Sequence, residues 1–401
     1  MPNKKLDFLF LIEHHDREYQ SVQNISNELL FLGYSSKILS IEFHLHKIMK
    51  YEPKVIILPY LFSKDLHPVD FITYFKNSIY FSLNWEQLLT GVNKEFKSPR
   101  DDFSRNQIFH YSWDKEFTNF LCSSGVNEKN IFLGGNVLHQ ILHSKNLQRT
   151  THKKELAKEF KLDSKKEWCF LPMNYSWAFI SSEMIQSKIK NGYPADKAYK
   201  YNEYAKQCLV YFISFLKEVL SKYKNVEFIL RPHPSISIDD YAKLIKNFSE
   251  IDNLIITKKH TISEWIVSSD YVGSSWSTSV WDASKIGKKT FLFTPIEKPE
   301  WHKVWWEPKV TNISSAQDLE LEKLNSTEHK INDLDKISLN LAKTLIEIKE
   351  NENPKRFSNN FKLKYILVYL RSFIREISIK YFNGIFIKKG MMRDYFNENE
   401  N

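Results

Sequence analysis

Phe228-Ile-Leu-Arg-Pro-His-Pro-Ser-Ile236 is a short apolar run that ends abruptly in Arg231-Pro-His-Pro234. An apolar run of this length is typical of a buried strand, and the prolines on both sides of His233 keep the following turn out of a helix. Arg231 offers a charged fork of donors, and His233 can donate from either ring nitrogen. The stretch therefore predicts an anion-binding strand end in an α/β domain. The alternative is a polar turn that caps the next helix.

A cluster of hydroxyl groups follows in Ser274-Ser-Trp-Ser-Thr-Ser279. It lies between a short apolar run, Tyr271-Val-Gly273, and an amphipathic stretch that starts at Val280. A helix start at this point adds backbone N–H groups and the positive end of the helix dipole. We therefore expect a phosphate site made by Arg231, His233, Pro234, Ser274, Ser275, Ser277, Thr278 and Ser279.

A third polar segment, Asn174-Tyr-Ser176, follows the predicted strand Trp168-Cys-Phe-Leu-Pro172 of the same half of the chain. In a nucleotide-binding α/β domain, ligands bind at the carboxyl ends of the strands. Asn174, Tyr175 and Ser176 are therefore predicted to contact the phosphate or the base of a nucleotide.

Carboxylates follow two predicted strands of the N-terminal half. Leu6–Ile12 runs into Glu13-His-His-Asp-Arg-Glu18, and Ser78–Leu83 runs into Asn84-Trp-Glu-Gln87. These strand ends are expected to face a cleft between two domains, so Glu13, Asp16 and Glu86 are candidates for a general base or a nucleophile. The alternative for the first segment is a solvated polar loop.

Strands alternate with helices along the chain without a sustained hairpin signal, which predicts an α/β protein. A length of 401 residues suits two domains. We expect an N-terminal, acceptor-side domain over residues 1–150 and a nucleotide-sugar domain over residues 151–330. A helical, basic segment should follow over residues 331–401.

That last segment carries much of the formal net charge of +9, which suits anionic partners. From Arg356 to Lys389 it is apolar, aromatic and basic, and Glu376 stands alone against Lys362, Lys364, Arg371, Arg375, Lys380, Lys388 and Lys389. Such a helix can lie on an anionic membrane surface or pack back across the domains. Nucleic acid is not an expected partner, because motifs such as zinc fingers and basic heptads are missing.

The three cysteines, Cys122, Cys169 and Cys208, lie far apart and lack metal-ligand spacing, so neither a disulfide framework nor a zinc site is expected. The N-terminus does not look like a signal peptide, and no apolar run is long enough to cross a bilayer. The expected location is the cytoplasm, with peripheral association at the inner face of the cell membrane.

The motifs together resemble bacterial surface-carbohydrate biosynthesis proteins with a GT-B glycosyltransferase fold, in which two Rossmann-like domains face a cleft and a C-terminal helical segment returns. The resemblance covers most of residues 6–300. Arg-Pro-His-Pro with the downstream hydroxyls is similar to motifs of CMP-sugar-dependent enzymes, including bacterial sialyltransferases and Kdo transferases. In those enzymes the His and the hydroxyls hold the CMP phosphate, which implies this role for His233, Ser277, Thr278 and Ser279.

The expected reaction moves a sugar, such as Kdo or another 2-ulosonic acid, from a CMP-sugar to a growing surface polysaccharide or lipopolysaccharide, with a saccharide or lipid-linked saccharide as acceptor. We expect neither metal nor cofactor, because donors in the phosphate site can neutralise the leaving group. One alternative is a CDP-polyol phosphotransferase of the teichoic acid polymerase type, which would use His14 or His233. Others are a non-catalytic nucleotide-sugar or polysaccharide-binding protein and a nucleotide-sugar epimerase.

Overall fold

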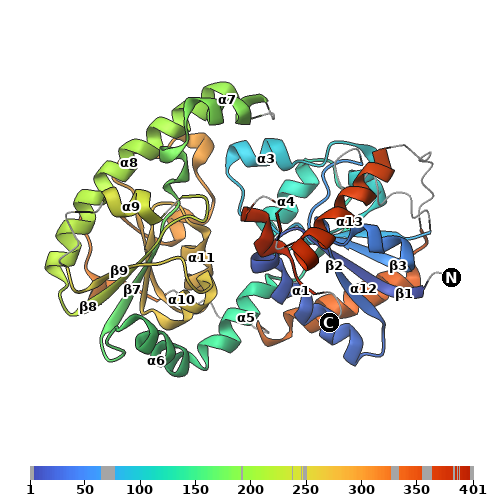
Figure 1. Cartoon of the computed structure of the whole chain (residues 1–401), viewed down its shortest axis with the longest axis horizontal. Helices are drawn as coiled ribbons and strands as arrows, with labels where there is room; N and C mark the ends of the chain where they lie inside the picture. The colour runs from blue at the N-terminus through green and yellow to red at the C-terminus, as the bar shows by residue number, and fades with distance from the viewer. Residues whose placement is uncertain are drawn as a thin grey trace. The chain divides into compact units, whose positions relative to one another are not determined.

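The computed structural model describes residues 4–64, 77–190, 193–236, 238–244, 246, 251–326, 334–354, 364–382, 384–385, 387 and 389–397. The chain divides into two compact units, both visible in Figure 1. Unit 1 comprises Met1–Leu88, Lys97–Gln140 and Asp335–Asn401, and unit 2 comprises Leu89–Phe96 and Ile141–Leu334. The chain thus passes from unit 1 into unit 2 and returns to unit 1 with its C-terminal residues.

Unit 1 is built on a parallel sheet of six strands in the order β2-β1-β3-β4-β5-β6. The strands are β1 (Lys4–Ile12), β2 (Ser36–Ser40), β3 (Tyr51–Leu58), β4 (Ile79–Ser82), β5 (Phe109–Ser112) and β6 (Ile131–Leu133). The strand order reverses between β1 and β3. In such sheets the loops that follow the two strands at this switch point diverge and leave room for a ligand.

Helices and side chains cover both faces of this sheet, as a parallel sheet requires. Alternate residues of β1 and β3, such as Leu9 and Ile56, pack with the 3-10 helix η1 (Leu45–Lys50) on one face. The helices α1 (His15–Phe31) and α12 (Ile337–Asn351) contact each other and the sheet. Unit 1 also holds α4 (Lys115–Ser123), α13 (Lys364–Phe382) and the 3-10 helix η10 (Lys389–Asp394), while α3 (Gly91–Lys97) and α5 (Val137–Asn146) lie where the chain changes unit.

Unit 2 has a second parallel sheet of six strands, in the order β12-β11-β10-β7-β8-β9. Its strands are β7 (Glu167–Pro172), β8 (Val226–Arg231), β9 (Leu254–Ile256), β10 (Tyr271–Ser274), β11 (Lys289–Phe293) and β12 (Thr311–Ile313). The order matches that of dinucleotide-binding Rossmann sheets, and its switch point lies between β7 and β10. The described strands of both units confirm the predicted α/β architecture with two Rossmann-like domains.

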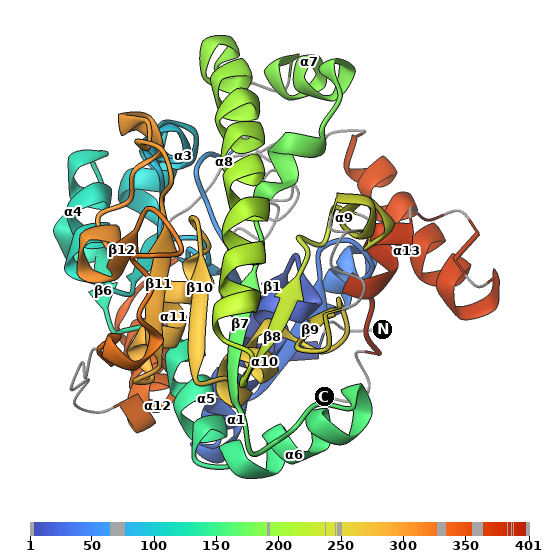
Figure 2. The same cartoon turned by 90° about the vertical axis from the view of Figure 1, so that its left-hand side faces the viewer.

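The long helix α8 (Ala195–Lys222) lies across one face of this sheet (Figure 2). Its buried side chains share a core with Leu171, Phe228 and Phe291. On the opposite face, Phe170 stacks on Trp265 of α10 (Ile262–Ser268). The alternation along β7 therefore sends odd and even residues into two different cores. The remaining helices are α6 (Arg149–Phe160), α7 (Ser182–Lys190), α9 (Ile238–Leu244) and α11 (Thr278–Lys285).

The helix α13 is fixed to unit 1 by a buried ion cluster. Glu376 is only 5% exposed and lies 2.9 Å from His46 Nε2, 2.5 Å from Lys47 Nζ and 2.6 Å from Lys380 Nζ. Burial alone would raise the pKa of Glu376, but the hydrogen bonds from His46, Lys380 and Lys47 outweigh burial and hold the pKa well below its usual range. Of the basic residues predicted on this segment, Lys362 and Lys388 lie outside the described residues. No helix among the described residues is long and apolar enough to span a bilayer.

Replacing Glu376 with Gln should loosen α13 at a cost of about 3 kcal/mol, because unpaired cations would remain against η1. A carboxyl with a lowered folded pKa stabilises the protein above the unfolded pKa of about 4.3, and this contribution disappears as the pH falls through the folded pKa. At pH 7 this contribution of Glu376 is fully present in the wild type. Amide exchange in α13 should therefore be faster in Glu376→Gln than in the wild type, and unchanged in the control Glu350→Gln, whose carboxylate is exposed. Unchanged exchange in α13 would contradict this anchoring role.

Candidate nucleotide-binding and catalytic sites

Two hydrogen bonds tie the loops at the switch point of unit 2. Tyr175, in the loop after β7, and Ser275, in the turn after β10, are both buried, and their hydroxyl oxygens lie 2.5 Å apart. The Ser274 hydroxyl donates to the carbonyl of Pro172 over 2.6 Å. Residues about a hundred positions apart in the chain are thus brought together, and the hydroxyls of Ser274 and Ser275 hold the two loops to each other.

The rest of the hydroxyl turn forms the start of α11. Ser277 is its N-cap, and its hydroxyl accepts from the backbone N–H of Ser279 over 3.3 Å. Thr278, the first residue of the helix, is exposed, whereas Ser279 is buried. The helix therefore begins two residues before the predicted start at Val280, because Ser277 caps it, and its N-terminal N–H groups are those that favour an anion.

Asn174 stands in the loop after β7 with an unsatisfied acceptor. Its Oδ1 is buried and has no hydrogen-bond partner among the described residues, whereas Ser176, two residues on, is partly exposed. Buried polar atoms are nearly always paired with protein, water or ligand. The amide of Asn174 is therefore suited to receive a donor group from a molecule bound at the switch point.

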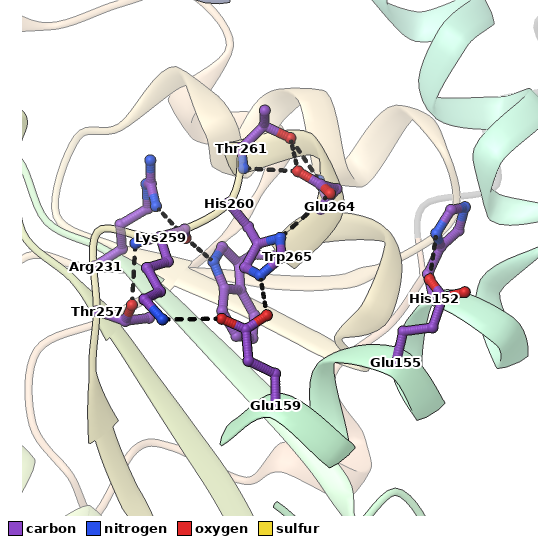
Figure 3. A network of polar contacts seen from close by, with 10 residues as sticks. All are labelled: His152, Glu155, Glu159, Arg231, Thr257, Lys259, His260, Thr261, Glu264 and Trp265. Atoms are coloured by element: carbon purple, nitrogen blue, oxygen red, sulfur yellow. Dashed lines mark hydrogen bonds and ion pairs between the residues drawn. The ribbon is translucent and has the colours of Figure 1, made fainter. Parts of the chain in front are cut away.

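The Arg-Pro-His-Pro turn lies one strand away from the switch point, after β8, and is bound to the loop after β9 (Figure 3). Arg231 Nη1 donates to the carbonyl of Lys259 over 2.8 Å, and Trp265 Nε1 donates to the same oxygen over 2.9 Å. Lys258 Nζ donates to the carbonyl of Pro234 over 3.0 Å. Part of the donor capacity of Arg231 thus positions a neighbouring loop.

His233 is oriented by its own turn. Its Nδ1 accepts from the backbone N–H of Ser235 over 3.2 Å and lies 2.8 Å from the Ser235 hydroxyl. In the neutral imidazole, an accepting Nδ1 leaves the proton on Nε2. The local fold therefore selects the tautomer in which Nε2–H is the donor.

The loop after β9 was not singled out from the sequence. His260 has a positive φ of 62°, and its ring lies between two carboxylates, with Nε2 2.6 Å from Glu159 and Nδ1 3.4 Å from Glu264. Glu264 also completes a capping box with Thr261 at the start of α10 (Figure 3). The sequence feature that could have indicated this loop is the basic run Lys258-Lys-His260, directly before that capping box.

The indole of Trp276 anchors the hydroxyl turn. It is 9% exposed and makes edge contacts with Tyr175, at a centroid distance of 5.0 Å, and with His302, at 5.5 Å. Burial lowers the pKa of His302 to about 3, so this ring is neutral. Trp306 is fully buried against Trp281 of α11. These aromatic side chains hold the turn and α11 in place.

Glu13 of unit 1 lies at the second switch point, directly after β1. Burial, followed by the charge of Glu13, raises the pKa of Tyr60, which follows β3 on the other side of the switch point. The backbone N–H of Glu13 donates to the carboxylate of Glu18 over 2.8 Å. Glu18 is fully buried and also accepts from Arg17, and burial raises its pKa despite that cation. Glu18 was missed as a site residue because a carboxylate on α1 gives no sequence signal of burial.

Arg17 connects Glu18 to Glu86, which follows β4 and also pairs with Lys97. Burial, with a further contribution from Arg17, lowers the pKa of Lys97 to about 8. The structure therefore brings the segments around Glu13 and Glu86 together through Arg17 and Glu18. Asp16 instead projects from the first turn of α1, 66% exposed and 3.6 Å from His15 Nδ1, where a carboxylate also favours the helix dipole.

A separate cavity of about 540 Å³ opens in unit 2 beyond the end of β11. Its lining runs from Thr294 to Asn312 and includes the buried pair Lys298 and Glu307. None of the predicted nucleotide residues lines it. The switch point of unit 2, where unsatisfied and oriented donors and acceptors gather, is therefore the better candidate site.

No protein-family model matches the sequence, and no curated protein sequence matches it. Solved structures do match. The wall teichoic acid polymerase TagF is 12% identical with a TM-score of 0.54, covering 86% of this chain and 89% of that chain. The UDP-GlcNAc 2-epimerase of Neisseria meningitidis bound to UDP-GlcNAc is 13% identical with a TM-score of 0.54, covering 86% and 100%.

A third match, the UDP-GlcNAc 2-epimerase of Methanocaldococcus jannaschii, is 10% identical with a TM-score of 0.52, covering 85% of this chain and 99% of that chain. Identities this low establish the fold and not the activity. The fold of this chain is GT-B, as its sequence predicts.

Proposed function

We propose that this protein is a GT-B glycosyltransferase that moves a sugar, such as Kdo or another 2-ulosonic acid, from a CMP-sugar to a growing surface polysaccharide or lipopolysaccharide. The observation that carries the proposal is the arrangement at the switch point of unit 2. There the Tyr175–Ser275 contact joins two loops, Asn174 holds an unsatisfied acceptor, and α11 begins at the hydroxyl turn.

The structural neighbours support a nucleotide-linked donor. A TagF variant has been soaked with CDPG, and the Neisseria epimerase is bound to UDP-GlcNAc. The choice of CMP rests on the resemblance of Arg231-Pro-His-Pro234 and the downstream hydroxyls to the motifs of CMP-sugar enzymes. Residues in the two segments would stabilise the negative charge that develops on the leaving phosphate.

In the proposed reaction, the bond between the anomeric carbon and the CMP phosphate oxygen breaks while the acceptor oxygen bonds to that carbon. The acceptor hydroxyl loses its proton to a carboxylate, and CMP leaves with the electrons of the broken bond. Glu13 is the preferred base, because it lies at a switch point. Its carboxylate lies 3.8 Å from His14 Nε2, whereas Glu86 is paired with both Arg17 and Lys97. Asp16, on the exposed side of α1, is the weakest of the three candidates.

Replacing His233 with Ala should weaken CMP binding about tenfold, the effect of losing one hydrogen bond to a charged group. Titration calorimetry with CMP, CDP, UDP and GDP measures this directly. Wild-type protein should prefer the cytidine nucleotides, and a preference for UDP or GDP would refute the CMP assignment. Ser314→Ala, in an exposed turn of unit 2, is the control and should bind CMP normally.

A CDP-polyol phosphotransferase is the second candidate, and one contact in unit 1 favours it. His14 Nδ1 lies 3.5 Å from the carboxylate of Asp394, and that carboxylate raises the pKa of His14. Histidine is the side chain that most often serves as a general base. CMP release from CDP-glycerol or CDP-ribitol, lost in His14→Gln, would support this reaction, whereas release from CMP-sugars alone would exclude it.

A further inference from the structure

The helix α13 turns its polar side toward unit 1 and its apolar side outward. Glu376 and Ser372 are buried, and the Ser372 hydroxyl lies 2.8 Å from His46 Nδ1 of η1. On the same side, Arg375 pairs with Glu42. These polar contacts are joined by Val368, which packs against the core of unit 1, and by the rings of Tyr369 and Phe373, which contact His46. Other large hydrophobic side chains of the helix, among them Leu367, Leu370 and Ile374, are exposed.

The outward side carries a continuous apolar stripe. At about 100° per residue, side chains centred on Leu370 cover roughly a third of the helix circumference. Leu367 is 64% exposed, Ile374 54% and Tyr381 75%. The exposed members of the stripe are Ile366, Leu367, Leu370, Phe373, Ile374 and Tyr381, and Phe382 and Ile385 extend the exposed surface at the end of the helix.

The charge that accompanies this stripe is positive. Glu376, the acid of the helix, is buried among three basic groups and contributes no exposed negative charge. Arg371 is exposed and lies about 100° from Leu370 on one side of the stripe, and Lys380 lies about 80° away on the other. An apolar stripe flanked by long cationic side chains complements a surface that is apolar within and anionic outside.

We infer that α13 lies in the surface of an anionic lipid bilayer, with the stripe around Leu370 inserted at the level of the headgroups. The helix has 19 residues, about 28 Å, and bears charged residues along its length, so it suits an orientation parallel to the membrane. The flanking Arg371 would contact lipid phosphates, and Tyr381 would occupy the interface that tyrosine prefers. This inference does not depend on which sugar or nucleotide the protein uses.

Vesicle flotation with the full-length protein tests the inference. Wild-type protein should float with vesicles of phosphatidylcholine and phosphatidylglycerol, and binding should fall with added salt and be much weaker on pure phosphatidylcholine. The double variant Leu367→Glu/Ile374→Glu should lower the partition coefficient about tenfold or more, because it removes apolar contact and adds charge of the wrong sign. Val210→Glu, at a 68% exposed position of α8, is the matched control and should bind like wild type.

Circular dichroism and thermal melting show whether the double variant folds, and unchanged spectra are expected because both side chains are exposed. Equal binding by the double variant and wild type would overturn the inference, as would failure of wild type to bind anionic vesicles. Light scattering gives the remaining outcome. If wild type dimerises without binding lipid and the double variant is monomeric, the stripe is a contact with a second copy, and the inference is wrong.

Discussion

Glutamine in place of Glu13 is expected to lower the turnover of a CMP-sugar by about 10²–10⁴-fold, the usual contribution of a general base. The substitution retains the size and the backbone N–H of Glu13, so the hydrogen bond to Glu18 should persist. The affinity for CMP should stay unchanged, because the predicted nucleotide residues belong to unit 2. Released CMP measures turnover, and calorimetry measures binding.

The comparison with other carboxylates makes this result specific. Because Glu86 balances the charges of Arg17 and Lys97, Glu86→Gln should lower turnover less than Glu13→Gln does. A larger loss of turnover in Glu86→Gln than in Glu13→Gln would identify Glu86 as the base. Glu116→Gln, at an exposed position of α4 in unit 1, should retain full activity. Wild-type turnover in both Glu13→Gln and Glu86→Gln would remove these carboxylates from the mechanism.

Alanine at Gly273 is expected to destabilise unit 2 by about 3 kcal/mol, near the upper end for overpacking a core. A Cβ atom at this position of β10 would lie 2.0 Å from the ring of Phe291, the paired residue on β11, and that ring is 1% exposed. Because Gly273 immediately precedes Ser274 and Ser275, the shift should also weaken CMP binding. Thermal or urea unfolding gives the loss of stability.

A double-mutant cycle tests the stated cause. Phe291→Leu should be destabilising alone, yet it should partly rescue Gly273→Ala by making room for the added methyl group. The double variant is therefore expected to be more stable than the sum of the single effects. Strict additivity would show that the loss at Gly273 has another origin, such as a change in backbone conformation.

Local patterns were sufficient for the elements that carry the candidate nucleotide site. The run Phe228–Leu230 forms half of β8, Ser277 caps α11, and Thr261 with Glu264 forms the capping box of α10. Each of these features depends on residues that are neighbours in sequence, where side-chain spacing and backbone preference act directly. The start of α8 was harder to predict, because the helix begins at Ala195, within a polar and weakly periodic stretch.

The partners of the site residues depended on strand order. Tyr175 and Ser275 meet because β10 pairs with β7, and Arg231 meets Lys259 because β9 pairs with β8. The complete burial of Glu18 follows from packing in unit 1, and its position on α1 alone would equally suit an exposed helix face. Such contacts arise from long-range packing, which composition and periodicity do not specify.

The sequence alone thus determined that two α/β domains are present, that the Arg-Pro-His-Pro turn ends a strand and that a hydroxyl-rich segment starts a helix. Only the tertiary structure decided which loops share a switch point, how Arg231 and His233 are oriented, and which side of α13 faces outward. The physical reason is the separation in sequence between the residues that interact. Caps, turns and amphipathic periods arise from neighbouring residues, whereas strand order and buried ion pairs are fixed by contacts between segments far apart in the chain.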